Sequence, residues 1–349
     1  MSHTFPPGFI DKAIAEGKSF FAIRYPQAAS WEWGVSDSVS AGIVPGSFVV
    51  APCDMESVGP VSIPFGGNSG QPGDMASFGR FPNESTPRED HRRAVETISA
   101  YHRRHGGKTV LSRVELIPLS GIPAESILWS LDRLYPDATV FGFSTPQSGL
   151  WVGATPELLL AASGGQLRTM ALAGTRRRGE SGEWDGKNIE EQRLVVDFIM
   201  DAMADCLPRE GELFTCQAGP VEHLCTAITA DASPLEKGEL QPDELLRRLS
   251  PTPALCGSDR AASMRLIASC EAHDRGAYGG FFGLYRSPGD FDFRVNLRSM
   301  RMEGATGALY AGGGITSLSR PDDEWTETCR KSESMRKALS DNAAFIENR

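Results

Sequence analysis

The stretch LYAGGGITSLSRPDDEWTETCRK, residues 309–331, runs from a short apolar strand through three glycines into an acidic helix. A helix that begins near Pro321 places Glu324, Glu327 and Lys331 on one face, because they follow one another at helical spacing. The glycines lack Cβ atoms, so they can adopt unusual backbone angles and let a ligand approach main-chain N–H groups. Two interpretations remain at this point: the helix face is solvated, or its carboxylates and its ammonium line a site.

The composition is that of a globular protein with a sizeable core. The chain has 349 residues, of which 40% are hydrophobic and 23% charged. Its net charge is −10 and it has no long basic block, which argues against a nucleic-acid partner. No apolar run reaches the roughly 18 residues of a membrane span, and the N-terminus lacks the pattern of a signal peptide. We therefore expect a cytoplasmic protein that binds neither nucleic acid nor membrane.

The seven cysteines are scattered and odd in number, and no two of them form a C-x-x-C pair. This pattern favours reduced thiols over a disulfide framework or a zinc site.

The strand and helix patterns predict an α+β fold with large, mostly antiparallel sheets and helices packed outside them, because the strict alternation of a parallel sheet is missing. We expect a hairpin of strands at 278–285 and 291–302, and helices at 123–135 and 187–207. Residues 52–87 are rich in Gly, Pro and Ser, so we expect a long loop there.

Two charged residues stand at the ends of apolar strands. Lys108 shares a strand face with Val110 and Val114, so it either reaches water from a strand end or lies at the rim of a pocket. Glu157 precedes the apolar run of residues 158–160. Its carboxyl group either faces solvent or is half-buried with a raised pKa and an available proton.

Each of three further side chains also has two possible interpretations. Glu191 continues the inward stripe of Val195 and Phe198, so it needs a partner, either a divalent cation or an arginine. Arg298 lies on the polar face of the strand at 291–302, which is either solvated or an anion site. His223 lies in a strand with a polar edge, where a structural role is more common than a catalytic one.

Taken in order, these segments resemble the chorismate-utilising enzymes. The motifs that carry the resemblance are KTVLSR at 108–113, TPELLL at 155–160, LAGTRRRG at 172–179, EEQRLVVD at 190–197, PTPALCG at 251–257, DRGAYGG at 274–280, AGGGI at 311–315 and EWTETCRK at 324–331. The family converts chorismate to isochorismate, salicylate, anthranilate or aminodeoxychorismate, with Mg2+ bound in the central cleft of a large α+β fold. The resemblance covers residues 84–340 and implies one structural domain, with 1–83 as a short N-terminal portion and 84–349 as the catalytic core.

Three positions distinguish the members of this family. Lys108 stands where the enzymes that use water carry a general-base lysine, whereas those that use ammonia have glutamine. Ala173 stands where aminodeoxychorismate synthases commonly place a nucleophilic lysine. Ala254 and Leu255 resemble the pocket loop of isochorismate synthases, and we therefore expect isochorismate synthase activity.

The resemblance also implies a role for each candidate residue. Lys108 would take a proton from the water that attacks carbon 2 of chorismate, and Glu157 would protonate the hydroxyl that leaves carbon 4, which requires a lysine with a lowered pKa and a glutamate with a raised one. Glu191, Glu324 and Glu327 would hold Mg2+. The residues expected to contact the substrate are His223, Ala254, Leu255, Tyr278, Arg298, Gly312, Gly314 and Lys331.

Some departures and alternatives accompany these expectations. Gln192 and Ser250 replace histidines of the family, and Gly313 replaces an alanine. Residues 1–107, which precede Lys108, form a shorter N-terminal part than the resemblance implies. We expect a monomer that needs no glutamine amidotransferase subunit. Its product would supply menaquinone or catecholate siderophore synthesis. The alternatives are a salicylate synthase or a catalytically silent protein that binds chorismate.

Overall fold

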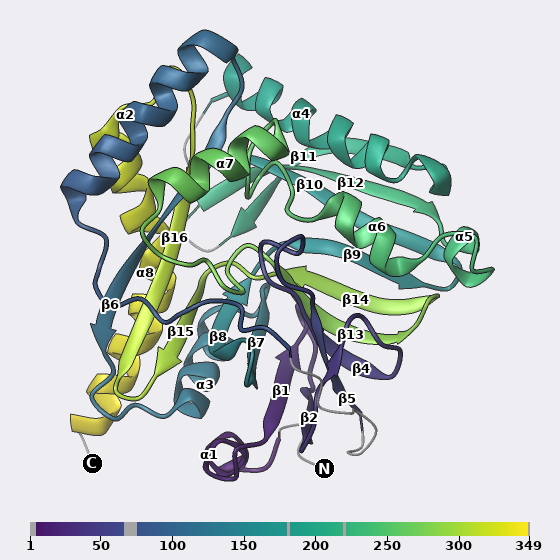
Figure 1. Ribbon diagram of the computed structural model, residues 1–349, viewed down its shortest axis with the longest axis vertical. Helices are drawn as coiled ribbons and strands as arrows, with labels where there is room; N and C mark the ends of the chain where they lie inside the picture. The colour runs from purple at the N-terminus through teal and green to yellow at the C-terminus, as the bar shows by residue number, and fades with distance from the viewer. Residues whose placement is uncertain (1–4, 66–74, 180–181, 219–220, 348–349) are drawn as a thin grey trace.

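The computed structural model describes residues 5–65, 75–179, 182–218 and 221–347, and these form two large sheets (Figure 1). Every described strand pair is antiparallel. The seven-stranded sheet contains, in spatial order, β2 (Glu32–Ser36), β1 (Ser19–Arg24), β7 (Thr139–Thr145), β8 (Gly149–Thr155), β15 (Ser299–Glu303), β16 (Thr306–Ile315) and β6 (Thr109–Pro118). The nine-stranded sheet contains β11 (Arg209–Ala218), β12 (Val221–Asp231), β10 (Gln166–Arg177), β9 (Leu158–Ser163), β14 (Asp290–Val295), β13 (Phe281–Ser287), β4 (Ser47–Val50), β5 (Val61–Pro64) and β3 (Ser40–Ala41).

The two sheets pack face to face, and helices cover their outer faces, as the α+β prediction requires. Phe21 of β1 stacks on Phe48 of β4 with ring centroids 4.6 Å apart, and the rings of Phe141 and Phe282 approach to 4.0 Å. These contacts join one sheet to the other. Alternation along each strand sends the neighbouring residue outward, so that Phe20 packs against the helices on the far side.

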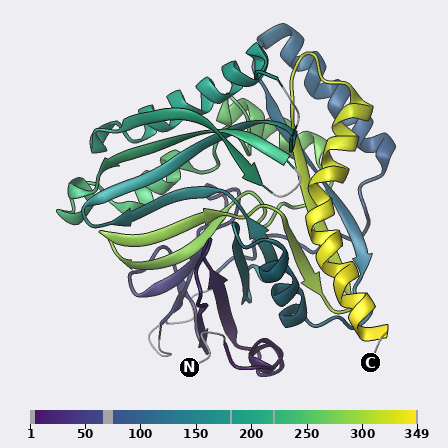
Figure 2. The ribbon, with the colours of Figure 1, turned by 180° about the vertical axis from the view of Figure 1, so that it is seen from behind.

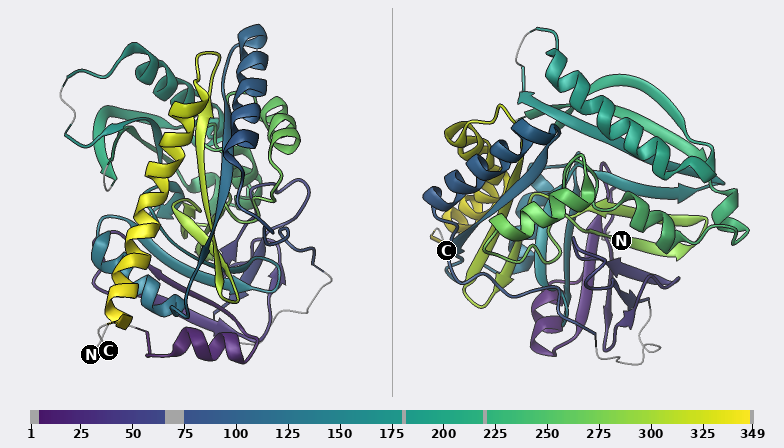
Figure 3. Two further views of the ribbon diagram at one scale, coloured as in Figure 1. Left: turned by 90° about the vertical axis from the view of Figure 1, so that its left-hand side faces the viewer. Right: turned by 45° about the horizontal axis from the view of Figure 1, so that its top comes forward.

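The helices divide between the two outer faces. Those packed against the seven-stranded sheet are α1 (Phe9–Ala15), α3 (Ala124–Leu134) and α8 (Pro321–Glu347), and α8 runs along its outer side (Figure 2). Those on the nine-stranded sheet are α4 (Gly186–Ala202) and α6 (Pro242–Leu249), with the short η1 (Ala204–Cys206) and α5 (Ser233–Glu236) nearby. The remaining two, α2 (Arg88–His105) and α7 (Arg260–Cys270), lie beside β6 (Figure 3). Within the described ranges, every helix is too short or too polar to span a bilayer.

The glycine triplet lies inside a regular strand, which corrects the expectation of unusual backbone angles. Gly312, Gly313 and Gly314 pair with Ser112, Leu111 and Val110 of β6, and none of the three has a positive φ. Their importance is steric. A Cβ atom on Gly312 would lie 2.9 Å from the Leu111 carbonyl oxygen, so there is no room for a side chain.

The strand expected at 291–302 is broken, and its two halves belong to different sheets. β14 ends at Val295 in the nine-stranded sheet, and β15 begins at Ser299 in the seven-stranded sheet. Arg298 lies in the break with a φ of 50°, a left-handed conformation that is uncommon outside glycine. The apolar and polar alternation continues through the break, so the sequence pattern did not reveal it. The expected loop at 52–87 contains the short strand β5, and it ends where expected, since α2 begins at Arg88; residues 66–74 of it lie outside the described residues.

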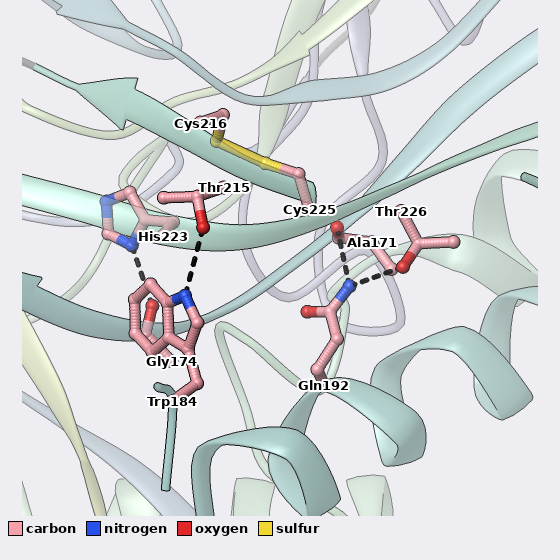
Figure 4. Close-up of a disulfide and its surroundings, with 9 residues drawn as sticks. All are labelled: Ala171, Gly174, Trp184, Gln192, Thr215, Cys216, His223, Cys225 and Thr226. Atoms are coloured by element: carbon pink, nitrogen blue, oxygen red, sulfur yellow. Dashed lines mark hydrogen bonds between the residues drawn. A yellow bond between two sulfur atoms is a disulfide. The ribbon is translucent and has the colours of Figure 1, made fainter. Parts of the chain in front are cut away.

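Two of the cysteines form a disulfide, which corrects the expectation that all seven thiols are reduced. Cys216 and Cys225 lie on the adjacent strands β11 and β12, with Cα atoms 6.1 Å apart (Figure 4). The other five cysteines are free. The pair arises from strand register and not from a local C-x-x-C motif, so the spacing in the sequence did not reveal it.

Candidate active site

The chain crosses from one sheet to the other at two adjacent places, and each crossing carries a predicted site residue. Glu157 lies between β8 and β9, and Arg298 lies between β14 and β15. The crossings are hydrogen-bonded to each other's flanks, since Val295 N–H donates to the Glu157 carbonyl at 3.1 Å and Ala154 N–H donates to the Arg298 carbonyl at 3.2 Å. The junction between the sheets therefore fixes both side chains.

A pocket of about 290 Å³ opens at this junction. It is lined by all thirteen residues that the sequence singled out: Lys108, Glu157, Glu191, His223, Ala254, Leu255, Tyr278, Arg298, Gly312, Gly314, Glu324, Glu327 and Lys331. The fold brings together side chains that are up to 223 positions apart in the sequence. The roles assigned to them above stay predictions.

Glu157 is buried, which settles the alternative between a solvated and a buried carboxyl group. Its exposed fraction is 5%, and burial raises its pKa from 4.5 to about 7. The nearby charges of Arg298, Lys108 and Lys331 oppose this shift without cancelling it. A substantial share of the carboxyl groups is therefore protonated at neutral pH and can donate a proton.

Lys108 is buried as well, so it does not extend from a strand end into water. It immediately precedes β6, its exposed fraction is 5%, and its Nζ forms an ion pair with Glu191. Its main-chain N–H donates to the Ser258 hydroxyl at 3.0 Å, which fixes the backbone at the mouth of the strand. The partners expected for Glu191 were a divalent cation or an arginine; among the described residues its ion-pair partner is Lys108 and not an arginine.

The carboxylates of α8 surround the glycine triplet. A Cβ atom on Gly313 would lie 3.3 Å from Glu324 Oε2 and 3.4 Å from Glu327 Oε1, and one on Gly314 would lie 3.8 Å from Glu191 Oε1. The glycines thus let three carboxylates from two helices approach one strand. Of the two interpretations of the helix face, solvated or lining a site, the structure supports the second.

Lys331 joins α8 to the same strand. Its Nζ donates to the Gly312 carbonyl at 2.8 Å and pairs with Glu327 at 2.7 Å. The ammonium thus lies between the strand and the helix, on the pocket wall.

The described residues that line the pocket carry more acids than bases. The cations are Lys108, Arg298 and Lys331, and the acids are Glu157, Asp185, Glu191, Glu324 and Glu327. A divalent cation with a preference for oxygen ligands fits both this donor set and the excess of negative charge. In the part of the chain that the structure describes, no three His, Cys, Asp or Glu side chains yet lie in an arrangement that could hold a metal ion. Two of the acids, Glu191 and Glu327, are instead paired with lysines.

Arg298 is a cation whose side chain forms no ion pair with any residue in the described ranges. Burial lowers its pKa, which means that the charged form is poorly solvated, while Tyr278, Glu327, Tyr135 and Glu157 act in the opposite direction. A half-buried guanidinium that lines a pocket and has no ion-pair partner among the described residues is suited to binding a carboxylate of a ligand. Between the solvated face and the anion site, the position of Arg298 in the pocket lining favours the anion site.

Tyr278 and Leu255 add a weakly polar and an apolar group to the pocket lining. Tyr278 is buried, and burial raises the pKa of its hydroxyl to about 12, so it remains a neutral donor. Leu255 is buried beside it, and its carbonyl accepts a hydrogen bond of 2.8 Å from Arg275. The loop that carries Ala254 and Leu255 is thus anchored from behind.

His223 is held in one tautomer by the strand beside it. Its Nδ1 lies 2.9 Å from the Gly174 carbonyl oxygen, which can only accept, so Nδ1 carries the proton (Figure 4). Burial lowers its pKa to about 4, and the ring is therefore neutral at pH 7. His223 can orient a ligand, but it is not a cation there.

Gln192, which departs from the family pattern, has a structural role that follows from its position. It is buried, and its amide donates to the Ala171 carbonyl at 3.1 Å and to the Thr226 hydroxyl at 3.0 Å (Figure 4). These bonds join α4 to β10 and β12. They fix the helix so that the neighbouring Glu191 faces the pocket.

The lining residues that were not predicted include two polar side chains at the start of α4. Asp185 caps α4 by accepting a hydrogen bond of 2.7 Å from the Asn188 main-chain N–H, and both side chains line the pocket. Asn188 lies three residues before Glu191, so it shares that helix face. The same helical spacing that identified Glu191 contained the signal for Asn188.

Comparison with known proteins identifies a family for this arrangement. A family model described as chorismate binding enzyme matches residues 74–340. The salicylate biosynthesis isochorismate synthase of Pseudomonas aeruginosa is 31% identical over 79% of this chain and 58% of its own length. The isochorismate synthase MenF of Bacillus subtilis is 32% identical over 73% of this chain and 56% of its own length. The chain therefore spans little more than half the length of these two curated relatives.

Solved structures extend the comparison to the fold. The menaquinone-specific isochorismate synthase MenF from Escherichia coli superimposes with a TM-score of 0.75 at 22% identity, over 92% of this chain and 88% of that one. Anthranilate synthase component I from Streptococcus pneumoniae superimposes with a TM-score of 0.69 at 18% identity, over 90% of this chain and 89% of that one. Because proteins with two different activities share the fold, the fold does not choose between those activities.

Proposed function

The chain belongs to the chorismate binding enzyme family, and we propose that within it the protein is an isochorismate synthase that converts chorismate to isochorismate. The observation that carries the proposal is the placement of Lys108 and Glu157 in one pocket, with a substantial share of the Glu157 carboxyl groups protonated at neutral pH. Water must lose a proton as it attacks carbon 2, and the hydroxyl on carbon 4 must gain one as it leaves. One base and one acid in the same pocket match these two demands.

In this proposal the remaining side chains bind and orient the substrate. Arg298 and Lys331 offer positive charge to the two carboxylates of chorismate, Tyr278 offers a hydroxyl, and the glycine triplet leaves room beside the strand. The neutral His223 and the apolar Leu255 surround the ring. Water activated within the pocket is the nucleophile, so we expect a monomer that needs no subunit to supply ammonia.

We further propose that Glu191, Glu324 and Glu327 hold Mg2+ in the working enzyme. Their oxygen donors and the excess of acids in the pocket support this choice. When bound, the ion supplies positive charge that stabilises a substrate carboxylate.

The proposal also constrains how Lys108 works. A general base needs an unshared electron pair, whereas Lys108 is engaged in an ion pair with Glu191. Glu191 must therefore bind another partner before Lys108 can act as a base. With the ion pair broken, Lys108 can face the attacking water.

Product analysis tests the proposed reaction. The protein is incubated with chorismate and Mg2+, with and without ammonium, and the products are separated by chromatography. We expect isochorismate in both cases. Salicylate with pyruvate would establish a salicylate synthase, anthranilate that depends on ammonium would establish the ammonia-using class, and chorismate binding without turnover would establish a silent protein. The isochorismate would enter menaquinone or catecholate siderophore synthesis.

Removal of divalent ions is expected to abolish turnover, and added Mg2+ is expected to restore it. Glu324→Gln is expected to weaken Mg2+ binding at least tenfold in calorimetry, because it replaces a charged ligand by a neutral amide. Asp323→Asn is the matched control, since Asp323 is exposed, adjacent on α8 and absent from the pocket lining. Equal Mg2+ affinity in the two variants would contradict the assignment of Glu324.

A further inference from the structure

A second pocket, of about 400 Å³, adjoins the first. The two pockets share two lining residues, Pro156 and Arg298. Both residues belong to the crossings between the sheets, so the two pockets adjoin at the same segments that position Glu157. We call the second pocket the outer pocket, and the first, which contains Lys108 and Glu157, the inner pocket.

The outer pocket carries two exposed cations at its edge. Arg178 follows β10, and Lys337 lies on α8, two turns beyond Lys331. Neither side chain forms an ion pair with a residue in the described ranges. Glu222, which is near enough for Arg178 to lower its pKa, is already bonded to Arg176 at 3.0 Å.

Two acids also line the outer pocket. Asp137 accepts a hydrogen bond from the Gln27 side chain, and Glu333 is exposed on α8, one turn before Lys337. With Arg178, Lys337 and Arg298 counted against these two, the outer pocket has an excess of positive charge. The inner pocket has an excess of negative charge. The protein as a whole is also negative, with a net charge of −10.

This contrast matters for an anionic substrate. Chorismate carries two carboxylates, so the field of the acidic protein repels it from most directions. The cationic edge of the outer pocket is a local exception, and it adjoins Arg298, a half-buried cation that lines both pockets.

We propose that the outer pocket is the route by which the dicarboxylate substrate enters, with Arg178 and Lys337 as positioning residues that attract it toward Arg298. The inference rests on the proposed function, because it takes chorismate as the substrate. The two outer cations act before the chemical step, and Arg298 receives a carboxylate at the boundary between the pockets. Glu333 opposes the attraction.

The expected size of the effect follows from Coulomb's law. One unit charge at about 10 Å from a dianion in water changes the encounter rate about threefold at 0.01 M ionic strength, where the Debye length is about 30 Å. At 0.3 M the screening length falls below about 8 Å, and the effect becomes small. A contribution of this kind alters kcat/KM and leaves kcat unchanged, because no contact with the reacting atoms is lost.

The test compares four charge variants of the whole chain. Arg178→Gln and Lys337→Gln are expected to lower kcat/KM for chorismate about threefold at low salt, and Glu333→Gln is expected to raise it about twofold. All three differences should disappear at 0.3 M salt, with kcat unchanged. Lys237→Gln removes the same charge from an exposed lysine at the C-terminus of α5 that lines neither pocket, and it should have no effect.

The opposite signs distinguish attraction from structural damage, since a damaged fold cannot raise kcat/KM in one variant and lower it in the others. If Arg178→Gln and Lys337→Gln behave like Lys237→Gln at low salt, the entry route is wrong even though the enzyme turns over. If the unmodified protein forms no isochorismate, the proposed function fails instead. Tryptophan fluorescence on mixing with chorismate then reports whether the same charges still control the association rate, and equal rates in all variants would overturn the route.

Discussion

Lys108→Ala is expected to lower kcat for chorismate on the order of 10²-fold or more, the usual loss when a general base is removed. The side chain is buried in the pocket, and in the described arrangement its ammonium is engaged by Glu191. Among the described residues, Lys331 is the other lysine in the pocket lining, and its ammonium is engaged by the Gly312 carbonyl and Glu327, so it does not replace Lys108 as the base. The measurement is the rate of isochorismate formation at saturating chorismate and Mg2+.

The substitution also leaves Glu191 without its ion-pair partner, so stability has to be measured together with activity. Chemical rescue is the control, because an added amine can replace a missing base but does not repair a structural defect. A small primary amine such as methylamine should restore part of the rate in Lys108→Ala and should not affect Lys237→Ala, in which an exposed lysine is removed. Near-normal turnover of Lys108→Ala without added amine would mean that the base lies elsewhere.

The site was predictable to the extent that its residues belong to ordered motifs. Local periodicity assigned Glu191 to an inward helix face, and α4 confirms that orientation. For Lys108, Glu157 and Arg298, periodicity left solvent as an alternative, because burial depends on strands that are distant in the sequence. The resemblance to a family removed that ambiguity by placing the same residue types in one cleft.

The parts that escaped prediction depend on pairing between segments and not on local sequence. The break at Arg298 is stabilised by bonds to the other crossing, as in the contact between Ala154 N–H and the Arg298 carbonyl. Neither Gly nor Pro marks residues 296–298, so no local signal was present. The disulfide between Cys216 and Cys225 has the same origin, since strand register brings the two sulfur atoms together.

The prediction of unusual backbone angles for the glycine triplet was wrong for a different reason. Three consecutive glycines usually indicate a turn, but here all three extend a strand that pairs with β6. Space for ligands, and not backbone freedom, explains them, because Gly313 faces two carboxylates at distances that leave little room for a methyl group. A sequence shows that a side chain is absent, but not which of these two reasons applies.

Glu157→Gln is expected to abolish most activity and at the same time to stabilise the protein at alkaline pH. Burial raises the pKa of Glu157 from 4.5 to about 7. The unfolded chain therefore releases this proton at a lower pH than the folded protein does. Above pH 4.5 the unfolded state gains stability from ionisation that the folded state lacks, and the penalty to folding grows until about pH 7 and then stays constant.

A shift of this size corresponds to a penalty of about 3 kcal/mol at pH 8 and about 1 kcal/mol at pH 5. Glutamine is uncharged, so Glu157→Gln should recover about 2 kcal/mol more at pH 8 than at pH 5, measured by urea unfolding at both values. Glu303→Gln is the matched control, because Glu303 is exposed at the end of β15 and should show no comparable gain.

The kinetic expectation has the same origin. A general acid must hold its proton, so kcat/KM of the unmodified enzyme should fall about tenfold per pH unit above pH 7. In Glu157→Gln the rate should be lower on the order of 10²-fold and should lose this alkaline decline. A variant that is less stable at both pH values would show that the carboxyl group serves the fold, whereas greater stability with lost activity is the signature of a group kept in place for catalysis.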